Sequence, residues 1–342
     1  MSETGPAEVI WDMTYACPLR CVHCYSESGR RPARRLDRAE LLRVADALVS
    51  LRPAGVALSG GEPLLVPGIV EVAARIGRAG IPVALYTSGW TLRPEQVDDL
   101  ARVFARISVS VDGATAAVHD RVRGRAGSFD RAMAALALLD AAETPVPFGI
   151  DFVAVRSNFH QLEQLCTDVA PRFPRLGQLW LGAAVPSGLA SRAGFAEHEL
   201  LTDEQARAMG GAELPARLRS LAPATVGVGT SDNLTLQMHP DHVANGTAFR
   251  AMQIEPDGEV RAMAIYEGTV GNIRTEDPMV LWNRAVARWS DPFVTATLGP
   301  VRTMRDWAHA ARRIDYHFGS AQVRARIDNR PQFALPLLEV AR

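Results

Sequence analysis

The stretch Glu8–Cys24, EVIWDMTYACPLRCVHC, joins an apolar run to three closely spaced cysteines. Its first part, Glu8–Thr14, is rich in residues that favour strands, and we predict a strand there. The cysteines follow at once, at positions Cys17, Cys21 and Cys24. The sequence therefore predicts a cysteine-bearing loop at the carboxyl end of a first strand.

The alternation of strand and helix continues through the first 190 residues. Further short apolar strands are predicted at Gly55–Leu58, Ile81–Tyr86, Ile107–Val111, Phe148–Val155 and Gln178–Ala183. Helices are predicted between them at Asp37–Leu51, Val66–Arg78, Pro94–Phe104, Ser128–Ala142 and Phe159–Ala170. Strands that are apolar on both faces and joined through helices form a parallel sheet covered by helices. We therefore predict an α/β fold, a partial (β/α)6 TIM-like barrel, with its site at the carboxyl ends of the strands.

The pattern changes after Pro186-Ser187-Gly188, which suggests a barrel domain over residues 1–200 and a smaller C-terminal domain over 201–342. The later segment is predicted to contain a helix at Thr202–Leu221 that Gly210-Gly211 and Pro215 interrupt, a β-hairpin of Phe249–Ile254 and Glu259–Ile265 around Pro256-Asp257-Gly258, helices at Met279–Trp289 and Thr303–Phe318, and a loose tail over the last twenty-odd residues.

The composition excludes several classes of protein. The 342 residues are 47% apolar and 22% charged, as in globular proteins, and the formal net charge of −1 argues against nucleic acid as a partner. No apolar run approaches the roughly 20 residues that span a membrane, and the first residues lack the pattern of a signal peptide. We therefore expect a soluble, cytoplasmic protein with no membrane partner. All 37 basic residues are arginine, which is typical of a GC-rich genome.

The cysteine spacing, C-x3-C-x2-C, indicates a metal site and not a disulfide framework, because three of the four cysteines fall within eight residues. Three thiolates can hold three irons of a [4Fe–4S] cluster and leave the fourth iron open to another ligand. The alternative is a zinc site of three cysteines completed by His23 or a distant histidine. The spacing favours iron–sulfur, since structural zinc sites usually pair two ligand clusters.

Other motifs follow the cysteines in order along the predicted barrel. Ser59-Gly60-Gly61-Glu62-Pro63 comes after the second strand, and Ser110-Val111-Asp112-Gly113 after the fourth. His119–Gly124 and Gly127-Ser128-Phe129 lie just beyond. Together with the cysteine loop, these motifs over residues 8–190 resemble the radical SAM superfamily, in its peptide- and sugar-modifying branch.

The resemblance implies that Cys17, Cys21 and Cys24 hold a [4Fe–4S] cluster and that S-adenosylmethionine (SAM) chelates the open iron. The implied SAM contacts are Gly60, Gly61 and Glu62 at the methionine amino group, Ser88 and Ser110 at the ribose, Arg123 at the carboxylate, and Tyr25 with His23 beside the cluster and adenine. Taken alone, the Gly-Gly-Glu-Pro segment is an ordinary turn and Arg123 a solvated charge. The implied chemistry is reductive cleavage of SAM to a 5′-deoxyadenosyl radical, with an external electron donor such as flavodoxin or ferredoxin.

The segment Gly246–Asn272 resembles the hairpin of a SPASM-type C-terminal domain, which normally carries auxiliary-cluster cysteines. Met263 stands where one of them is expected, and no cysteine follows it. We therefore expect a single cluster and a redox-neutral reaction such as epimerisation, which needs a second hydrogen donor. Cys166 and Tyr266 are the candidates, although a cysteine on an apolar helix stripe and a tyrosine near a hairpin end more often pack in a core.

Only about eight residues precede the first strand, where peptide-modifying relatives often carry a leader-binding module. This favours a small molecule or oligosaccharide as the substrate, and we predict a tailoring epimerase for an oligosaccharide antibiotic of the avilamycin kind. The alternatives are a peptide epimerase or maturase, and a non-catalytic paralogue that keeps only a metal site.

Overall fold

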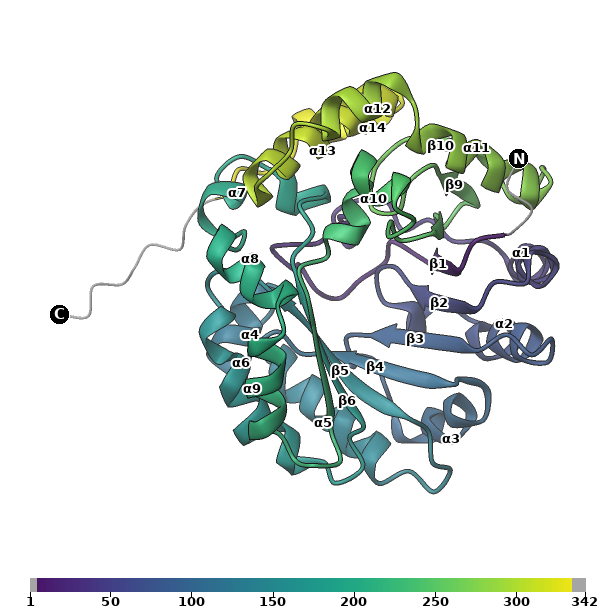
Figure 1. The fold of residues 1–342 in the computed structure, drawn as a ribbon. Coiled ribbons are helices and arrows are strands. Elements are labelled where there is room, and N and C mark those ends of the chain that lie inside the picture. The colour runs from purple at the N-terminus through teal and green to yellow at the C-terminus, as the bar shows by residue number, and fades with distance from the viewer. Residues whose placement is uncertain (1–4, 334–342) are drawn as a thin grey trace.

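The computed structural model describes residues 5–333, and in that part of the chain ten strands form one sheet. Their order across the sheet is β10-β9-β8-β1-β2-β3-β4-β5-β6-β7 (Figure 1). The strands are β1 (Glu8–Asp12), β2 (Gly55–Ser59), β3 (Val83–Thr87), β4 (Arg106–Ser110), β5 (Phe148–Ala154), β6 (Gln178–Ala183), β7 (Gly227–Ser231), β8 (Ala251–Ile254), β9 (Glu259–Arg261) and β10 (Thr269–Asn272). Strands β1 to β7 are parallel to their neighbours, which confirms the predicted α/β partial barrel.

Helices cover one face of this sheet (Figure 1). In chain order, the helices of the described residues, including those that lie off this face, are α1 (Arg38–Leu51), α2 (Ile69–Gly77), α3 (Pro94–Val103), α4 (Ala116–Arg123), α5 (Ser128–Asp140), α6 (Leu162–Gln164), α7 (Phe195–His198), α8 (Asp203–Gly210), α9 (Glu213–Leu221), α10 (Pro240–Ala244), α11 (Pro278–Trp289), α12 (Pro292–Leu298), α13 (Met304–Phe318) and α14 (Ala321–Asp328). The helix predicted at Phe159–Ala170 is instead a chain of short helical segments, including a π-helical turn, η3, at Leu165–Val169.

The two faces of the strands differ in chemistry. The face toward the helices is apolar and fully buried, with Trp11 of β1 and Phe152 of β5 among its largest side chains. The opposite face, which we call the inner face, carries small and polar residues such as Ser108, Asp151 and Gln253. Because side chains alternate along a strand, each strand contributes to both the apolar core and the polar inner face.

The C-terminal strands extend the barrel sheet. Strand β8 pairs with β1 in parallel, with Ile10 opposite Gln253, and β9 and β10 follow in antiparallel order. The predicted hairpin is thus confirmed, although its strands are shorter than expected. The sheet also runs across the predicted domain boundary at residue 200, so the division into 1–200 and 201–342 remains a prediction.

Several helices were not predicted. The motif His119–Gly124 lies largely in α4, and the predicted loose tail contains α14 before the described residues end. The helix expected at Thr202–Leu221 divides between α8 and α9, as predicted at the glycine pair. Pro215 does not interrupt α9, because it lies in the first turn, where a missing N–H costs nothing. Within residues 5–333, no helix has the length and apolar character needed to cross a membrane.

Candidate functional site

The three cysteines lie on the loop between β1 and α1, and their thiols are free and partly buried. Each sulfur has one hydrogen-bonding group beside it, an N–H donor at Cys17 and Cys21 and a hydroxyl that can donate at Cys24. The Leu19 N–H is 3.5 Å from Cys17 Sγ, and the Arg123 Nη1 is 3.8 Å from Cys21 Sγ. The Ser26 hydroxyl lies 3.5 Å from Cys24 Sγ. Donors to thiolate sulfurs are typical of iron–sulfur sites, where they stabilise the negative charge of the ligands.

The cysteine set fits a cluster that spreads its ligands over several irons. Burial raises the pKa of Cys17 to about 12 and that of Cys21 to about 11, so iron binding must displace protons from both thiols. Within residues 5–333 no three His, Cys, Asp or Glu side chains are grouped closely enough to hold a metal ion in this conformation. The ring of His23 is also engaged elsewhere, with Nε2 2.9 Å from Asp112 Oδ2.

The Gly-Gly-Glu turn after β2 packs directly against the start of the cysteine loop. Gly61 N–H donates to the Thr14 carbonyl at 2.7 Å, and Glu62 N–H donates to the Ala16 carbonyl at 2.8 Å. A Cβ on Gly61 would lie 2.2 Å from the Ala16 carbonyl oxygen, and Gly60 has a φ of +113°. Glycine is therefore required at both positions by this close approach and by the backbone conformation.

The carboxylate of Glu62 is fully buried and is occupied by protein donors. One oxygen accepts from the Thr87 hydroxyl at 2.7 Å and from the Leu64 N–H at 3.2 Å. The other accepts from the N–H of Ser88 at 3.0 Å and from the Ser88 hydroxyl. Glu62 and Ser88, which the sequence analysis placed at different parts of SAM, thus bind each other and fasten the end of β2 to the end of β3.

Asp112, at the end of β4, is the centre of the polar network on this side of the loop. Its Oδ2 contacts the Arg123 Nε at 2.7 Å as well as His23, and its Oδ1 accepts from the Val153 N–H at 2.8 Å. Burial alone would raise the pKa of Asp112, but the Arg123 charge and the His23 hydrogen bond hold it well below its usual range. The sequence analysis noted Asp112 only as the end of a strand; its position after a buried strand was the available signal.

Helix α4 reaches the same loop through its backbone. The Arg123 carbonyl accepts from the Arg20 N–H at 3.0 Å, and the Val122 carbonyl accepts from the Val22 N–H at 2.9 Å. The last carbonyls of a helix have no partners within it, so here the loop supplies them. This explains why Arg123 is buried at the cysteines and is not a solvated surface charge.

On the other side, Asp12 links the loop to the C-terminal strands. Its Oδ1 accepts from the Tyr25 hydroxyl at 2.6 Å, and its Oδ2 accepts from Gln253 Nε2 of β8 at 2.8 Å. Gln253 in turn accepts from the Ile265 N–H at 2.7 Å. Tyr25 is therefore held beside the cysteines by a buried chain of hydrogen bonds that ends in the hairpin. The sequence analysis did not identify Asp12 or Gln253.

A second link joins the loop to the end of the described chain. The buried carboxylate of Glu27 accepts from the Arg326 Nε at 3.1 Å, and from the Arg330 Nε at 3.0 Å and Nη2 at 2.8 Å. Glu27 has a φ of +54°, an unfavourable conformation that these contacts help to maintain. Arg192 contributes as well, since its Nη2 donates to the Val22 carbonyl at 2.9 Å.

The remaining predicted residues divide into two groups. Ser110 lies at the carboxyl end of β4, beside the site. Cys166 lies in η3, fully buried in the apolar core of the helical layer, and is not brought to the cysteine loop. The Tyr266 hydroxyl donates to the Gln237 carbonyl at 2.8 Å and accepts from the Trp307 Nε1 at 2.7 Å. The structure thus places both candidate hydrogen donors in buried surroundings, and neither is hydrogen-bonded to the cysteine loop.

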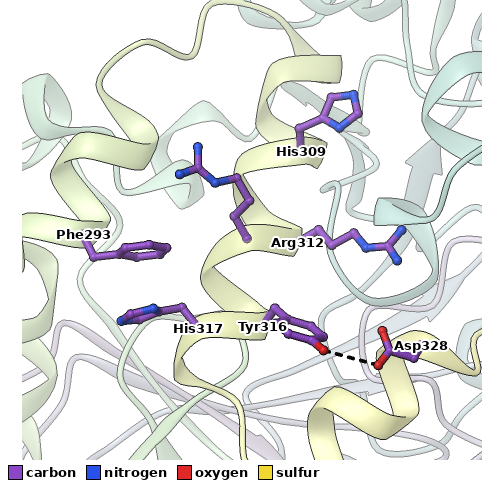
Figure 2. Close-up of a pocket in the computed structure, with 7 residues that line it drawn as sticks. Phe293, His309, Arg312, Tyr316, His317 and Asp328 are labelled. Carbon is purple, nitrogen blue, oxygen red and sulfur yellow. Dashed lines mark hydrogen bonds between the residues drawn. The ribbon is translucent and has the colours of Figure 1, made fainter.

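A shallow pocket on the outer helices is built from different residues (Figure 2). It is lined by Phe293, His309, Arg312, Arg313, Tyr316, His317 and Asp328. Phe293 stacks on His317, and the Tyr316 hydroxyl lies 3.5 Å from the Asp328 carboxylate. Because no residue of this pocket comes from the cysteine loop or the strand ends, the candidate site is the cysteine loop and the strand edge beneath it.

Comparison with known proteins finds that part of the chain is similar to a known superfamily. Residues 11–167, slightly less than half of the chain, match the model of the Radical SAM superfamily. The matched residues contain the cysteine loop, the Gly-Gly-Glu turn, Asp112 and Arg123. The cofactors that this match implies are a [4Fe–4S] cluster and SAM.

Three curated relatives resemble the chain over this part. The AdoMet-dependent heme synthase of Methanosarcina barkeri is 38% identical over 160 residues, 46% of this chain and 45% of the relative. The mycofactocin maturase MftC of Mycobacterium tuberculosis is 36% identical over 164 residues, which are 48% of this chain and 41% of the relative. The PqqA peptide cyclase of Ruegeria pomeroyi is 33% identical over 166 residues, which are 48% of this chain and 44% of the relative. In each case the match spans less than half of the relative's length.

A solved structure shows the same fold over more of the chain. Streptococcus suis SuiB bound to S-adenosylmethionine superimposes with a TM-score of 0.60 at 16% identity, covering 84% of this chain and 67% of SuiB. The likeness therefore extends beyond residue 167 and includes strands that follow the matched domain.

Proposed function

We propose that the chain is a radical SAM enzyme that abstracts a hydrogen atom from a peptide substrate. The observation that supports this most directly is the cysteine loop, in which three free thiols each lie beside a hydrogen-bonding group within the residues that match the Radical SAM model. When bound, the cluster supplies the electron that cleaves SAM into methionine and a 5′-deoxyadenosyl radical. The protein's part is to hold, orient and shield these groups.

In this proposal Cys17, Cys21 and Cys24 hold three irons, and the Arg123 guanidinium beside Cys21 receives the SAM carboxylate. Gly60 and Gly61 present their backbone to the methionine amino group, and Ser110 faces the ribose. The resemblance implied that Glu62 contacts the methionine amino group and Ser88 the ribose. In this proposal the two residues instead support the Gly-Gly turn, because they are hydrogen-bonded to each other. Tyr25 shields the cluster from a position fixed by Asp12.

A peptide substrate is favoured over a sugar by the relatives, which include a maturase and a peptide cyclase. This supports the alternative of the sequence analysis better than its first hypothesis, an epimerase for an oligosaccharide antibiotic. The heme synthase among the relatives shows that the domain also serves other substrates. The substrate class is thus the first point to test.

A redox-neutral reaction such as epimerisation remains the preferred outcome. Met263 is buried at the position where an auxiliary-cluster cysteine was expected, and the fourth cysteine, Cys166, is buried in the apolar core. Neither offers a ligand for a second cluster that would accept the electron left on a substrate radical. The carbon radical must then take a hydrogen atom from a solvent-exchangeable S–H group, which becomes a thiyl radical and is restored by one electron from the external donor and one proton from water. We assign this role to a thiol supplied from outside the chain, because Cys166 and Tyr266 are both engaged in the core.

The experiment is anaerobic reconstitution followed by incubation with SAM and dithionite. About four irons per chain and release of 5′-deoxyadenosine are expected. The Cys166→Ala variant is the matched control and should retain both. About eight irons per chain would contradict the single cluster, and bound zinc without SAM cleavage would support the non-catalytic paralogue.

The substrate class is tested in deuterated water with two candidate substrates, a precursor peptide from the gene neighbourhood and an oligosaccharide. Epimerisation of the peptide predicts one deuterium at a single Cα, detected by mass spectrometry. A modified oligosaccharide with an unchanged peptide would instead restore the sugar hypothesis. A crosslinked peptide, two hydrogens lighter, would overturn the redox-neutral outcome.

A further inference from the structure

Two neighbouring side chains on the inner face have no role in the network described above. They are Asp151 on β5 and Trp180 on β6, which are opposite each other in the parallel ladder. Their Cα atoms are therefore about 4.8 Å apart, the usual spacing of neighbouring strands. The residues that follow each of them, Phe152 and Leu181, point into the buried core, so Asp151 and Trp180 point the other way.

Trp180 is exposed to an extent that is unusual for its size. It is 44% exposed although it lies within a strand of the barrel sheet. Its six-membered ring rests against Gly229 of β7, its partner in the ladder, where a Cβ would come within 2.6 Å of the ring. The glycine thus leaves room for the indole, and the rest of the ring surface is available to a ligand.

Asp151 is an acidic group without a direct partner. The charges of Arg106 and Arg123 act on it only from a distance, and no described donor is hydrogen-bonded to its carboxylate. Burial raises the pKa of Asp151 to about 6, so the group is still mostly ionised at neutral pH. Asp12, by contrast, has both oxygens occupied by Tyr25 and Gln253. A partly buried anion of this kind is stabilised by a cation or a strong donor.

The pair is also close to the proposed SAM site. Asp151 is opposite Ser110 of β4, the residue that we place at the ribose. A group bound between Asp151 and Trp180 therefore lies one or two strand spacings, about 5–10 Å, from Ser110. At that distance it can fix the part of a substrate next to the reacting carbon.

We propose that Asp151 and Trp180 bind a cationic side chain of the peptide substrate, an alkylammonium or a guanidinium group. The carboxylate accepts its N–H groups, and the indole ring contacts its charge and its methylenes. A neutral sugar could stack on the indole and donate a hydroxyl to the carboxylate, but it would bring no positive charge to this partly buried anion. This inference rests on the proposed function and specifies which part of the peptide the inner face recognises.

The test is saturation-transfer NMR on the reconstituted enzyme with SAM, which needs no turnover. The probes are N-acetyl-lysine methylamide, its neutral analogue N-acetyl-norleucine methylamide, and methyl glucoside. We expect transfer to the lysine side chain, with at least about tenfold weaker binding of the other two. Asp151→Asn and Trp180→Leu should each weaken lysine binding about tenfold, and Trp180→Phe should restore part of it. Asp130→Asn, an exposed aspartate on α5, is the matched control and should change nothing.

Equal binding of the lysine and norleucine probes, unchanged affinity in both variants, or preference for the glucoside would each overturn the proposal. SAM affinity is measured on the same samples and should stay within about twofold. A loss of SAM binding in Asp151→Asn with intact lysine binding would assign the carboxylate to SAM and would also overturn it. This test measures binding of the probes, whereas the proposed function is tested by release of 5′-deoxyadenosine. Failure of SAM cleavage would therefore refute the proposed function without deciding whether Asp151 and Trp180 bind the lysine probe.

Discussion

The cysteine loop is supported from two sides, and the two supports differ in kind. On the barrel side, Arg123 reaches a cysteine sulfur and is held there by Asp112. On the C-terminal side, Gln253 and Arg330 contact the loop only through Asp12 and Glu27, away from the sulfurs. The comparison indicates that the barrel side sets the chemistry of the site, whereas the C-terminal side sets the shape of the loop.

The largest effect is expected at the cysteines themselves. Cys21→Ser replaces a thiolate ligand by a hydroxyl, a poor ligand for iron–sulfur clusters. Iron per chain after reconstitution should fall by at least about tenfold, and 5′-deoxyadenosine release should stop. Iron content retained at the level of Cys166→Ala would show that Cys21 is not a ligand.

A smaller but still large effect is expected on the barrel side. Asp112→Asn removes the charge that pairs with buried Arg123, and breaking a buried pair costs roughly 3 kcal/mol of unfolding free energy. We also expect SAM affinity to fall by about tenfold because Arg123 is no longer held beside Cys21. Chemical denaturation and equilibrium SAM binding measure the two effects. Stability lost with full SAM affinity would mean that the barrel side, too, is only structural.

The C-terminal side should behave differently. Glu27→Gln leaves Arg330 without a charge partner and leaves Arg326 paired only with Glu267, so the unfolding free energy should fall by roughly 2–3 kcal/mol and α14 should become more sensitive to protease. SAM affinity of the reconstituted protein should change less than about threefold. Glu163→Gln, which breaks an exposed pair with Arg217, is the control, and its cost should be below about 1 kcal/mol. A tenfold loss of SAM affinity in Glu27→Gln would remove the distinction between the two sides.

The smallest expected effect is a pH dependence of the unfolding free energy on the C-terminal side. Asp315, behind the Glu27 network, accepts from the Glu267 N–H at 2.8 Å, and burial with the nearby Glu267 charge raises the pKa of Asp315 to about 7. The folded state then holds a proton that the unfolded chain loses near pH 4, so its contribution to stability falls as pH rises from about 4 to 7.

The variant Asp315→Asn lacks this proton. Its unfolding free energy, relative to the unchanged protein, should therefore rise by roughly 2 kcal/mol between pH 5 and pH 8. Denaturation of both proteins at each pH measures the difference. A difference that stays constant with pH would show that Asp315 is ionised in the folded protein.

The sequence predicted the structural features that are determined by residues close together in the chain. The strand before the cysteines, the glycine turn and the helix over Asp37–Leu51 each follow from local pattern, and all are present. The supports of the loop were not predicted. Gln253 and Asp12 are 241 residues apart, and Arg330 and Glu27 are 303 apart, so periodicity and spacing carry no information about which of them meet.

The same limit applies to β8. The turn residues Pro256-Asp257-Gly258 predicted that β8 belongs to a hairpin, but the choice of β1 as its neighbour depends on an open sheet edge and on the Gln253–Asp12 contact. Buried Asp12 carried a weak signal, a charged residue at the end of an apolar strand. A carboxylate in that position needs donors, and the donors come from a distant part of the chain.

The pairing of β1 with β8 has a consequence for the order of folding. One edge of β1 pairs with β2, which is synthesised soon after β1. The other edge stays unpaired until residues 251–254 of β8 have been synthesised. During synthesis the first strand therefore exposes an unpaired edge for most of the chain's length, a condition that invites association between chains and slows completion of the sheet. The link from Asp12 to Gln253 beside the cysteine loop forms only when this edge closes, and the contacts of Glu27 with Arg326 and Arg330 come later still. Cluster insertion should accordingly be a late event, one that a truncated chain ending before β8 would not support.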